Sequence, residues 1–225
     1  MSRAALGAIF DMDGVLIDST EAHFAAWSRL GDEVGMPMRR EIFEGTFGMH
    51  NRQILPLWLG DHLESAEIER LSERKEAMFR KEAPNSVRAL DGAVELVEQL
   101  DNAGFALAVG SSGPRANVEL ILDLLGVRAR FDALATGDDV HHGKPDPEVF
   151  LTAAARLSLP PGSCAVIEDA PQGIQAGLRA GCRVIAVAST RPRSELGAAH
   201  LVVESLREVR AGAVQSLLAA GVVPR

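Results

Sequence analysis

The chain has 225 residues and a formal net charge of −8, with 47% hydrophobic and 24% charged residues. This composition is typical of a globular protein and excludes a disordered or collagen-like chain. The net negative charge disfavours general nucleic-acid binding, because the phosphate backbone requires a basic surface. Two cysteines are too few for a disulfide framework. No apolar run approaches the ~18 residues of a membrane span. We therefore expect a cytoplasmic protein that binds neither nucleic acid nor membranes.

Short apolar runs alternate with helical patterns along much of the chain. Runs without polar alternation are typical of strands that are covered on both faces. They occupy residues 5–10, 105–109, 133–135, 164–167, 183–187 and 201–203. Helices are expected between them, at residues 93–100, 118–125, 147–157 and 173–180. This order predicts an α/β fold with a Rossmann-like, doubly wound parallel sheet.

The segment from residue 18 to residue 88 interrupts that alternation. Helices are expected at residues 21–34 and 65–82, and no convincing strand is present. We interpret residues 18–88 as a helical cap domain inserted into a core made of residues 1–17 and 89–225.

The chain is expected to cross between cap and core twice, near residues 18–20 and 84–90. Pro84, Asn85 and Ser86 have the composition of a hinge.

The first expected strand ends in Asp11-Met12-Asp13-Gly14. Two carboxylates two residues apart on an extended chain point to the same side. Both would face the crevice where open α/β sheets bind ligands, at the carboxyl ends of the strands. Close carboxylates repel each other unless a cation or a shared proton offsets their charge. Because Mg²⁺ prefers carboxylates, waters and phosphate oxygens, the pair points to Mg²⁺ and phosphate chemistry. The same four residues are also common in ordinary loops.

Polar groups follow three further strands in the same way. Ser111 and Ser112 offer hydroxyls and amides to phosphoryl oxygens. Lys144 would offset phosphate charge, and Glu168-Asp169 would complete a metal site. Each has an ordinary interpretation by itself, as a turn, a solvated lysine or a helix N-cap. Their joint occurrence after successive strands is difficult to assign to chance.

These four segments resemble the motifs of the haloacid dehalogenase superfamily of phosphotransferases. The first motif is similar to residues 10–19, the second to Ser111, the third to Lys144 and the fourth to Glu168-Asp169. The resemblance covers nearly the whole chain. The helical insertion is similar to the cap of the subgroup that contains β-phosphoglucomutase and many sugar-phosphate and phosphoglycolate phosphatases.

The resemblance implies two catalytic residues. Asp11 would attack phosphorus and form an aspartyl phosphate, which splits the transfer into two steps. Asp13 would protonate the leaving oxygen and then activate water or an acceptor hydroxyl. By resemblance, the dehalogenases of the superfamily lack this second aspartate, so Asp13 favours phosphoester chemistry over carbon–halogen cleavage.

The resemblance also implies the binding groups. The transferring phosphoryl group would be held by Ser111, Ser112 and Lys144. The metal, Mg²⁺, would be held by the Asp11 carboxylate, the Asp13 carbonyl oxygen, Asp169 and, through its water shell, Glu168.

Three cap residues bear on the type of reaction. His23 resembles a hinge-region histidine of β-phosphoglucomutase that couples cap closure to catalysis, and Lys75 resembles a cap lysine that reaches the closed site. Both favour a mutase, although His23 also fits a packing role and Lys75 a solvated helix face. Arg52 could bind a distal phosphate or sugar of the substrate, but it follows Gly48 by four residues, whereas the mutase loop has a spacing of three. The 48–55 loop is therefore closer to that of related phosphatases.

The sequence thus predicts a monomeric, Mg²⁺-dependent phosphatase of a small phosphomonoester, such as a sugar phosphate, acting through an aspartyl phosphate. A β-phosphoglucomutase-type mutase is the alternative. A third possibility is a regulatory module that kept the fold without turnover, but an intact set of Asp11, Asp13, Lys144 and Asp169 argues against it.

Overall fold

A computed structural model describes residues 6–220 of the chain. Its main sheet consists of β1 (Gly7–Phe10), β4 (Ala106–Gly110), β5 (Ala133–Ala135), β6 (Cys164–Glu168), β7 (Arg183–Val187) and β8 (Leu201–Val203). The strand order is β5-β4-β1-β6-β7-β8, and every pairing is parallel. The predicted doubly wound α/β fold is confirmed. Residue 5 of the first expected strand lies outside the described residues.

Helices cover both faces of this sheet. One face packs against α5 (Ala93–Asn102), α6 (Arg115–Leu124) and α9 (Ala211–Ala219), and the other against α7 (Glu148–Leu157) and α8 (Pro171–Arg179). On β1, Ala8 and Phe10 face the first of these cores and Ile9 the second, and all three are fully buried. A strand with apolar residues on both faces explains why these runs lack alternation. Short 3₁₀ turns are found at Arg128–Arg130, Gly137–Asp139, Pro161–Ser163, Arg193–Glu195 and Leu206–Glu208.

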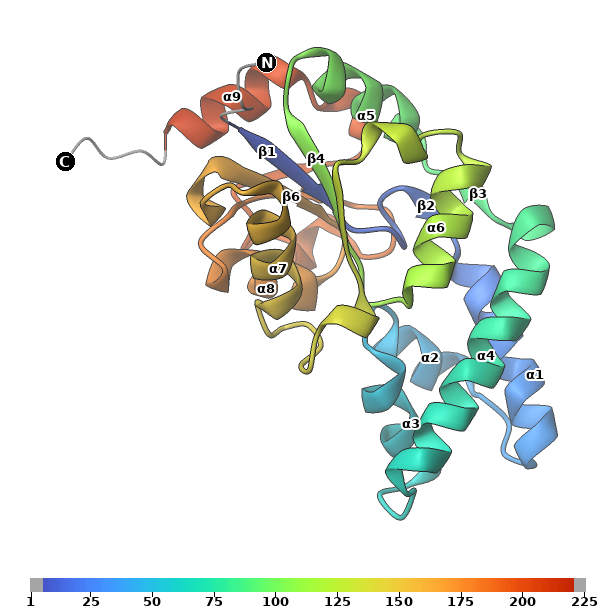
Figure 1. Cartoon of the computed structure of the whole chain (residues 1–225). Helices are drawn as coiled ribbons and strands as arrows, with labels where there is room; N and C mark the ends of the chain where they lie inside the picture. Colours follow the sequence, from blue (N-terminus) through green and yellow to red (C-terminus); the bar gives the residue numbers. More distant parts are fainter. Residues whose placement is uncertain (1–5, 221–225) are drawn as a thin grey trace.

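Four helices form a separate cap beyond one end of the sheet (Figure 1). They are α1 (Thr20–Val34), α2 (Arg40–Thr46), α3 (Asn51–Leu59) and α4 (Ser65–Ser86). The expected helices at residues 21–34 and 65–82 are present. Trp27 and Trp58 pack edge to face inside the cap, with ring centroids 5.7 Å apart. Among residues 6–220, no helix combines the length and apolar character that crossing a membrane would require.

Three local expectations in the cap region were wrong. Much of the expected 48–55 loop is helix α3, whose N-terminus is capped by His50; histidine is not a usual cap, so the sequence signal was absent. Two short strands, β2 (Ile17–Asp18) and β3 (Arg88–Ala89), pair antiparallel at the crossing, and two residues are too few to give a periodic pattern. The expected hinge residues 84–86 form the last turn of α4.

Pro84 does not end α4 because the turn around it is held on both sides. Ala83 is fully buried, and its carbonyl oxygen accepts a hydrogen bond from the Val87 amide at 3.0 Å. Pro84 removes only the hydrogen bond that its own amide would donate, and the helix ends two residues later, at Ser86.

Candidate active site

The sequence-predicted residues converge where the chain changes direction across the sheet. From β1 the chain passes to β4 and β5 on one side, and β6, β7 and β8 lie on the other. Open α/β sheets bind ligands at such a switch point, outside the carboxyl ends of the strands. Asp11 directly follows β1, Ser111 follows β4, and Asp169 follows β6.

A buried lysine joins two carboxylates at this edge. Lys144 is 3% exposed, and its Nζ lies 3.0 Å from Asp11 Oδ1 and donates to Glu168 Oε1 at 2.6 Å. Burial alone would lower the pKa of this lysine, but the two carboxylates outweigh it and hold the pKa well above its ordinary value. Lys144 is therefore a fixed positive charge beside Asp11.

Negative charge is nevertheless in excess around Asp11. Burial, supported by Glu168 and Asp13 and opposed by Lys144, raises the pKa of Asp11 to about 7. Burial together with Glu168 and Asp11 raises the pKa of Asp169 well above its ordinary value. Carboxylate oxygens of Asp11, Glu168 and Asp169 all lie within 4.8 Å of one another. A bound cation would offset this charge, so the oxygen donors fit a divalent metal.

The carboxylates of this cluster differ in how they are held. Glu168 Oε1 accepts from Lys144, and Oε2 accepts from the amides of Asp169 and Ala170 at 2.8 and 3.0 Å. Both oxygens of Glu168 are thus engaged by the protein. Asp169 is fixed through Oδ2 by the Thr190 hydroxyl, which leaves its other oxygen for a cation. This arrangement favours Asp169 over Glu168 as a direct metal ligand.

Two glycines make room for these carboxylates. Gly14 has a positive φ of 76°, and a Cβ atom there would lie 2.1 Å from Asp169 Oδ2. A Cβ atom on Gly173 would lie 1.7 Å from Glu168 Oε1. Side chains at these positions are therefore incompatible with the observed cluster.

Residues of the cap reach Asp13. Ser19 Oγ donates to Asp13 Oδ1 at 2.5 Å, and His23 Nε2 lies 3.0 Å from the same oxygen. Lys75 Nζ, from α4, lies 2.7 Å from His23 Nδ1. Burial acts to raise the pKa of Asp13, but His23, Ser19 and Lys75 outweigh it and hold the pKa below its ordinary value. The structure therefore brings both cap candidates, His23 and Lys75, into one chain of contacts with Asp13.

A small cavity of about 50 Å³ separates the core site from the cap. Asp11, Asp13 and Ser112 line its core side. The Ser112 hydroxyl is buried and has no hydrogen-bond partner among the residues that the structure describes, so it is available to a bound oxygen. The cap side of the cavity is lined by His23, Trp27, Phe43, Phe47, Gly48, Met49, Asn51, Ile54, Lys75 and Glu76. The cavity thus presents polar groups on one wall and mainly apolar side chains on the other.

Two predicted site residues lie less directly at this cavity. Ser111 is buried, and its hydroxyl accepts a hydrogen bond from the Gly113 amide at 3.0 Å, so it braces the loop. Arg52 lines an adjoining hollow, and its Nε donates to Glu69 Oε1 at 2.8 Å. The Arg52 side chain is half exposed, and its charge is already paired.

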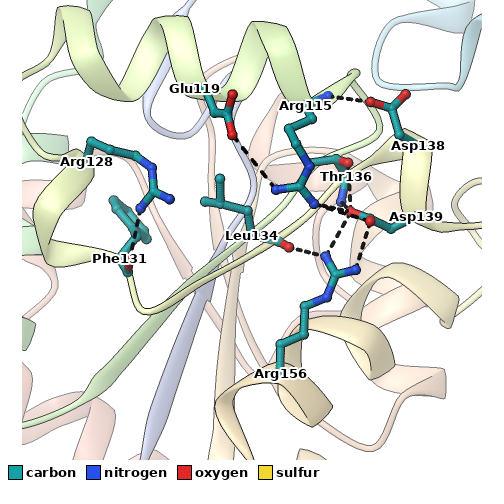
Figure 2. A network of polar contacts seen from close by, with 9 residues as sticks. All are labelled: Arg115, Glu119, Arg128, Phe131, Leu134, Thr136, Asp138, Asp139 and Arg156. Carbon is teal, nitrogen blue, oxygen red and sulfur yellow. Dashed lines mark hydrogen bonds and ion pairs between the residues drawn. The ribbon is translucent and has the colours of Figure 1, made fainter.

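A polar network joins α6, α7 and the segment that follows β5 (Figure 2). Asp139, just after β5, accepts hydrogen bonds from Arg156 on α7 at 2.8 and 2.9 Å and from Arg115 on α6 at 3.0 and 3.2 Å. Thr136 donates to it through both its amide and its hydroxyl. Because the Gly137 amide donates to the Gly113 carbonyl oxygen at 2.8 Å, the network also braces the loop after β4.

Sequence reasoning missed Thr190 and Glu76. Thr190 closely follows β7, so the rule that found Asp11 and Asp169, polar residues after parallel strands, could also have found it. Glu76 lies on a charged helix among several other glutamates and carries no local signal of its burial.

The comparisons with known proteins agree with this geometry. A family model described as haloacid dehalogenase-like hydrolase matches residues 8–187. The chain belongs to this family. Validoxylamine A 7'-phosphate phosphatase of Streptomyces hygroscopicus subsp. limoneus is 34% identical, over 90% of this chain and 95% of that protein.

Both predicted reaction types occur among the similar proteins. β-Phosphoglucomutase of Bacillus subtilis (strain 168) is 34% identical, over 82% of this chain and 84% of that one. A solved β-phosphoglucomutase from Clostridium difficile superposes with a TM-score of 0.84 at 26% identity, covering 95% and 97% of the two chains. The predicted family, its capped Rossmann-like fold and the class of phosphoric monoester hydrolases are confirmed.

Proposed function

We propose that this protein is a Mg²⁺-dependent phosphatase of small phosphomonoesters that acts through an aspartyl phosphate on Asp11. One observation carries the proposal: Asp11 and Asp13 line the same cavity, with a fixed cation beside the first and cap residues bound to the second. The cap of residues 18–88 and the core of residues 1–17 and 89–225 are proposed as its two domains.

The reaction takes place in two steps at these residues. In the first step, an oxygen of Asp11 forms a bond to phosphorus while the ester P–O bond breaks, and Asp13 in its protonated form gives that proton to the leaving oxygen. In the second step, Asp13 takes a proton from water, the water oxygen attacks phosphorus, and Asp11 is released with inorganic phosphate. Lys144, Ser111 and Ser112 hold the phosphoryl oxygens and lower the cost of the charge that develops there.

The acidic cluster supports a magnesium site. Asp11, Asp169 and the carbonyl oxygen of Asp13 would hold Mg²⁺, with Glu168 acting through the metal's water shell. When bound, the ion supplies positive charge between the nucleophile and the phosphate. Carboxylate and carbonyl donors favour a hard cation such as Mg²⁺ over softer metals.

The cap side of the cavity supports a substrate with a single phosphate. Lys75 is the one lysine or arginine among the described residues that line the cavity, and His23 and Glu76 already engage it. A second phosphate would require a free cation there. Apolar and aromatic side chains instead suit the carbon skeleton of a sugar or polyol. This favours hydrolysis over a mutase reaction that handles bisphosphates.

A phosphosugar mutase is the second candidate. The contact chain from Lys75 through His23 to Asp13 supports it, because a mutase must keep its acid–base group for a sugar hydroxyl rather than water. The similarity to β-phosphoglucomutases is compatible with either reaction.

An activity panel separates the two candidates. Purified protein with Mg²⁺ is given phosphorylated sugars, phosphorylated polyols and phosphoglycolate, and free phosphate is measured. One further sample contains β-glucose 1-phosphate with a bisphosphate primer. Phosphate release that is absent with Asp11→Asn supports the phosphatase, and formation of glucose 6-phosphate without phosphate loss supports the mutase. Absence of both reactions would contradict the proposal. A monomeric state and a cytoplasmic location stay predictions.

A further inference from the structure

A buried carboxylate lies behind Lys75 and has no role in the mechanism above. Glu76, the next residue on α4, is 5% exposed. Its Oε1 accepts from Lys75 Nζ at 2.8 Å and from Asn51 Nδ2 at 2.7 Å, and its Oε2 accepts from Asn117 Nδ2 at 2.5 Å. A buried carboxylate is costly unless its oxygens are bonded, and here both oxygens are bonded.

One of these partners comes from the core. Asn117 lies on α6, whereas Glu76, Lys75 and Asn51 lie on cap helices. Arg80 donates to the Asn117 Oδ1 at 2.8 Å, which directs the amide nitrogen of Asn117 toward Glu76. Since Asn117 lies in the first turn of α6, shortly after Ser112, it is fixed relative to the phosphate-binding loop. The Glu76–Asn117 hydrogen bond therefore exists only while the cap lies on the core.

The contacts of Glu76 continue to the acid–base residue. Lys75 donates to His23 Nδ1, so that nitrogen is an acceptor and the hydrogen of a neutral ring is on Nε2, which faces Asp13. The Lys75 ammonium also lies 5.1 Å from the centroid of the Trp27 ring, so three groups contact the same charge. Glu76 and His23 contact this ammonium at 2.8 and 2.7 Å, respectively.

We propose that Glu76 is a positioning residue: held by Asn117 of the core, it keeps Lys75 on His23 and thereby orients Asp13 when the cap is closed. The inference rests on the proposed function, because it assigns a support to the acid–base group of that reaction. The Glu76–Asn117 hydrogen bond connects the core to the cap residues that contact Asp13. Closure of the cap therefore forms the last contact that orients Asp13.

The test compares two substrates that depend differently on Asp13. An alkyl ester such as β-glycerophosphate needs a proton on its leaving oxygen, whereas p-nitrophenyl phosphate releases p-nitrophenolate readily without one. The value of kcat/KM reports the first step, transfer to Asp11. For Glu76→Gln we expect kcat/KM to fall about 10-fold for the alkyl ester and less than about 3-fold for the aryl ester. Glu73→Gln, the same change at an exposed position of α4, should leave both values near wild type.

A second variant tests the link to the core. Asn117→Ala should reduce kcat/KM for the alkyl ester several-fold. The double variant Glu76→Gln and Asn117→Ala should have a value little below that of Glu76→Gln alone, because both changes act on the same chain of contacts. An unchanged alkyl-ester value, an equal loss on both esters, or losses that multiply would overturn the inference. Failure of the proposed function is distinct: the wild type would show no Mg²⁺-dependent phosphate release that Asp11→Asn removes. Should Glu76→Gln not fold, Asn117→Ala is measured on both esters, and the alkyl ester should again lose more than the aryl ester.

Discussion

The two halves of the active site are built in different ways. On the core side, Asp11 and Asp169 directly follow strands of one sheet, Lys144 lies in the loop between β5 and α7, and their contacts are made within the core. On the cap side, His23 and Lys75 come from two helices, and the contacts of their group reach Asp13 and Asn117 of the core. The core therefore holds the phosphate-transfer groups in place by itself, whereas the support of Asp13 depends on where the cap lies.

The core half should be indispensable for turnover. Asp11→Asn removes the proposed nucleophile while keeping its size, so we expect phosphate release to fall at least about 10⁴-fold. The fold should persist, because Lys144 keeps its contact with Glu168. The measurement is phosphate release with Mg²⁺ alongside thermal unfolding, with exposed Asp123→Asn as the control. Activity within about 10-fold of wild type would remove Asp11 from its role.

The buried lysine should serve both activity and stability. Lys144→Met keeps the length of the side chain but leaves Asp11 and Glu168 without their cation. We expect turnover to fall about 10²–10³-fold and the free energy of unfolding to drop by about 3–5 kcal/mol. Denaturant unfolding and phosphate release measure the two effects, and exposed Lys81→Met should change neither. A variant as stable as wild type would contradict the compensation of charge at this edge.

The cap half should show a smaller loss. Lys75→Met removes the ammonium between His23 and Glu76, and we expect kcat to fall about 10–100-fold, because Asp13 keeps Ser19 and His23 as partners. Steady-state kinetics on β-glycerophosphate measures the effect. A loss in kcat as large as that of Lys144→Met would show that the cap residues contribute as much to turnover as the core lysine.

The network behind the phosphate-binding loops should affect stability at acid pH. The pKa of Asp139 lies below its ordinary value of 3.8, and the hydrogen bonds from Arg156 are the largest cause. Burial acts in the opposite direction but is outweighed. The carboxylate therefore stabilises the fold above that pH, and this contribution is lost as the pH falls through the lower folded-state pKa. Because Arg156 is 38% exposed and screened by water, we expect Asp139→Asn to cost about 1 kcal/mol at pH 7.

Denaturant unfolding from pH 7 to pH 2 tests this network. Wild type and Asp139→Asn should approach each other in stability as the pH falls below 3.8. A constant difference across that range would contradict the role given to the Asp139 charge.

Arg52 should have the smallest effect. Its guanidinium is paired with Glu69 and lies outside the cavity that contains Asp11. We therefore expect Arg52→Ala to change kcat/KM for a monophosphate less than about 2-fold. A loss above about 10-fold would bring Arg52 into substrate binding and strengthen the mutase alternative.

The difference between core and cap also explains which site residues could be predicted from the sequence. Asp11, Asp13, Ser111 and Glu168-Asp169 were found because each follows a strand whose apolar run is visible, and parallel strands bring their carboxyl ends together. The backbone fixes these positions locally. The strand limits at Ala133–Ala135, Arg183–Val187 and Leu201–Val203 were likewise predicted as the structure has them.

The cap contacts could not be derived in that way. His23 and Lys75 are 52 positions apart, and Glu76 and Asn117 are 41 apart, on helices whose mutual approach no local pattern encodes. Only resemblance singled out Lys75, and nothing singled out Glu76. The helix α3 was missed for a local reason, since its capping box has the usual Gln53 but an unusual N-cap residue, His50.

The most direct test of the account is to trap the phosphoenzyme. Wild type and Asp11→Asn are mixed with Mg²⁺ and radiolabelled acetyl phosphate, quenched in acid, digested and analysed by mass spectrometry. We predict label on the wild-type peptide that contains Asp11 and none on the variant. Turnover by the wild type without a labelled protein, or label on Asp11→Asn, would contradict an aspartyl phosphate at this residue.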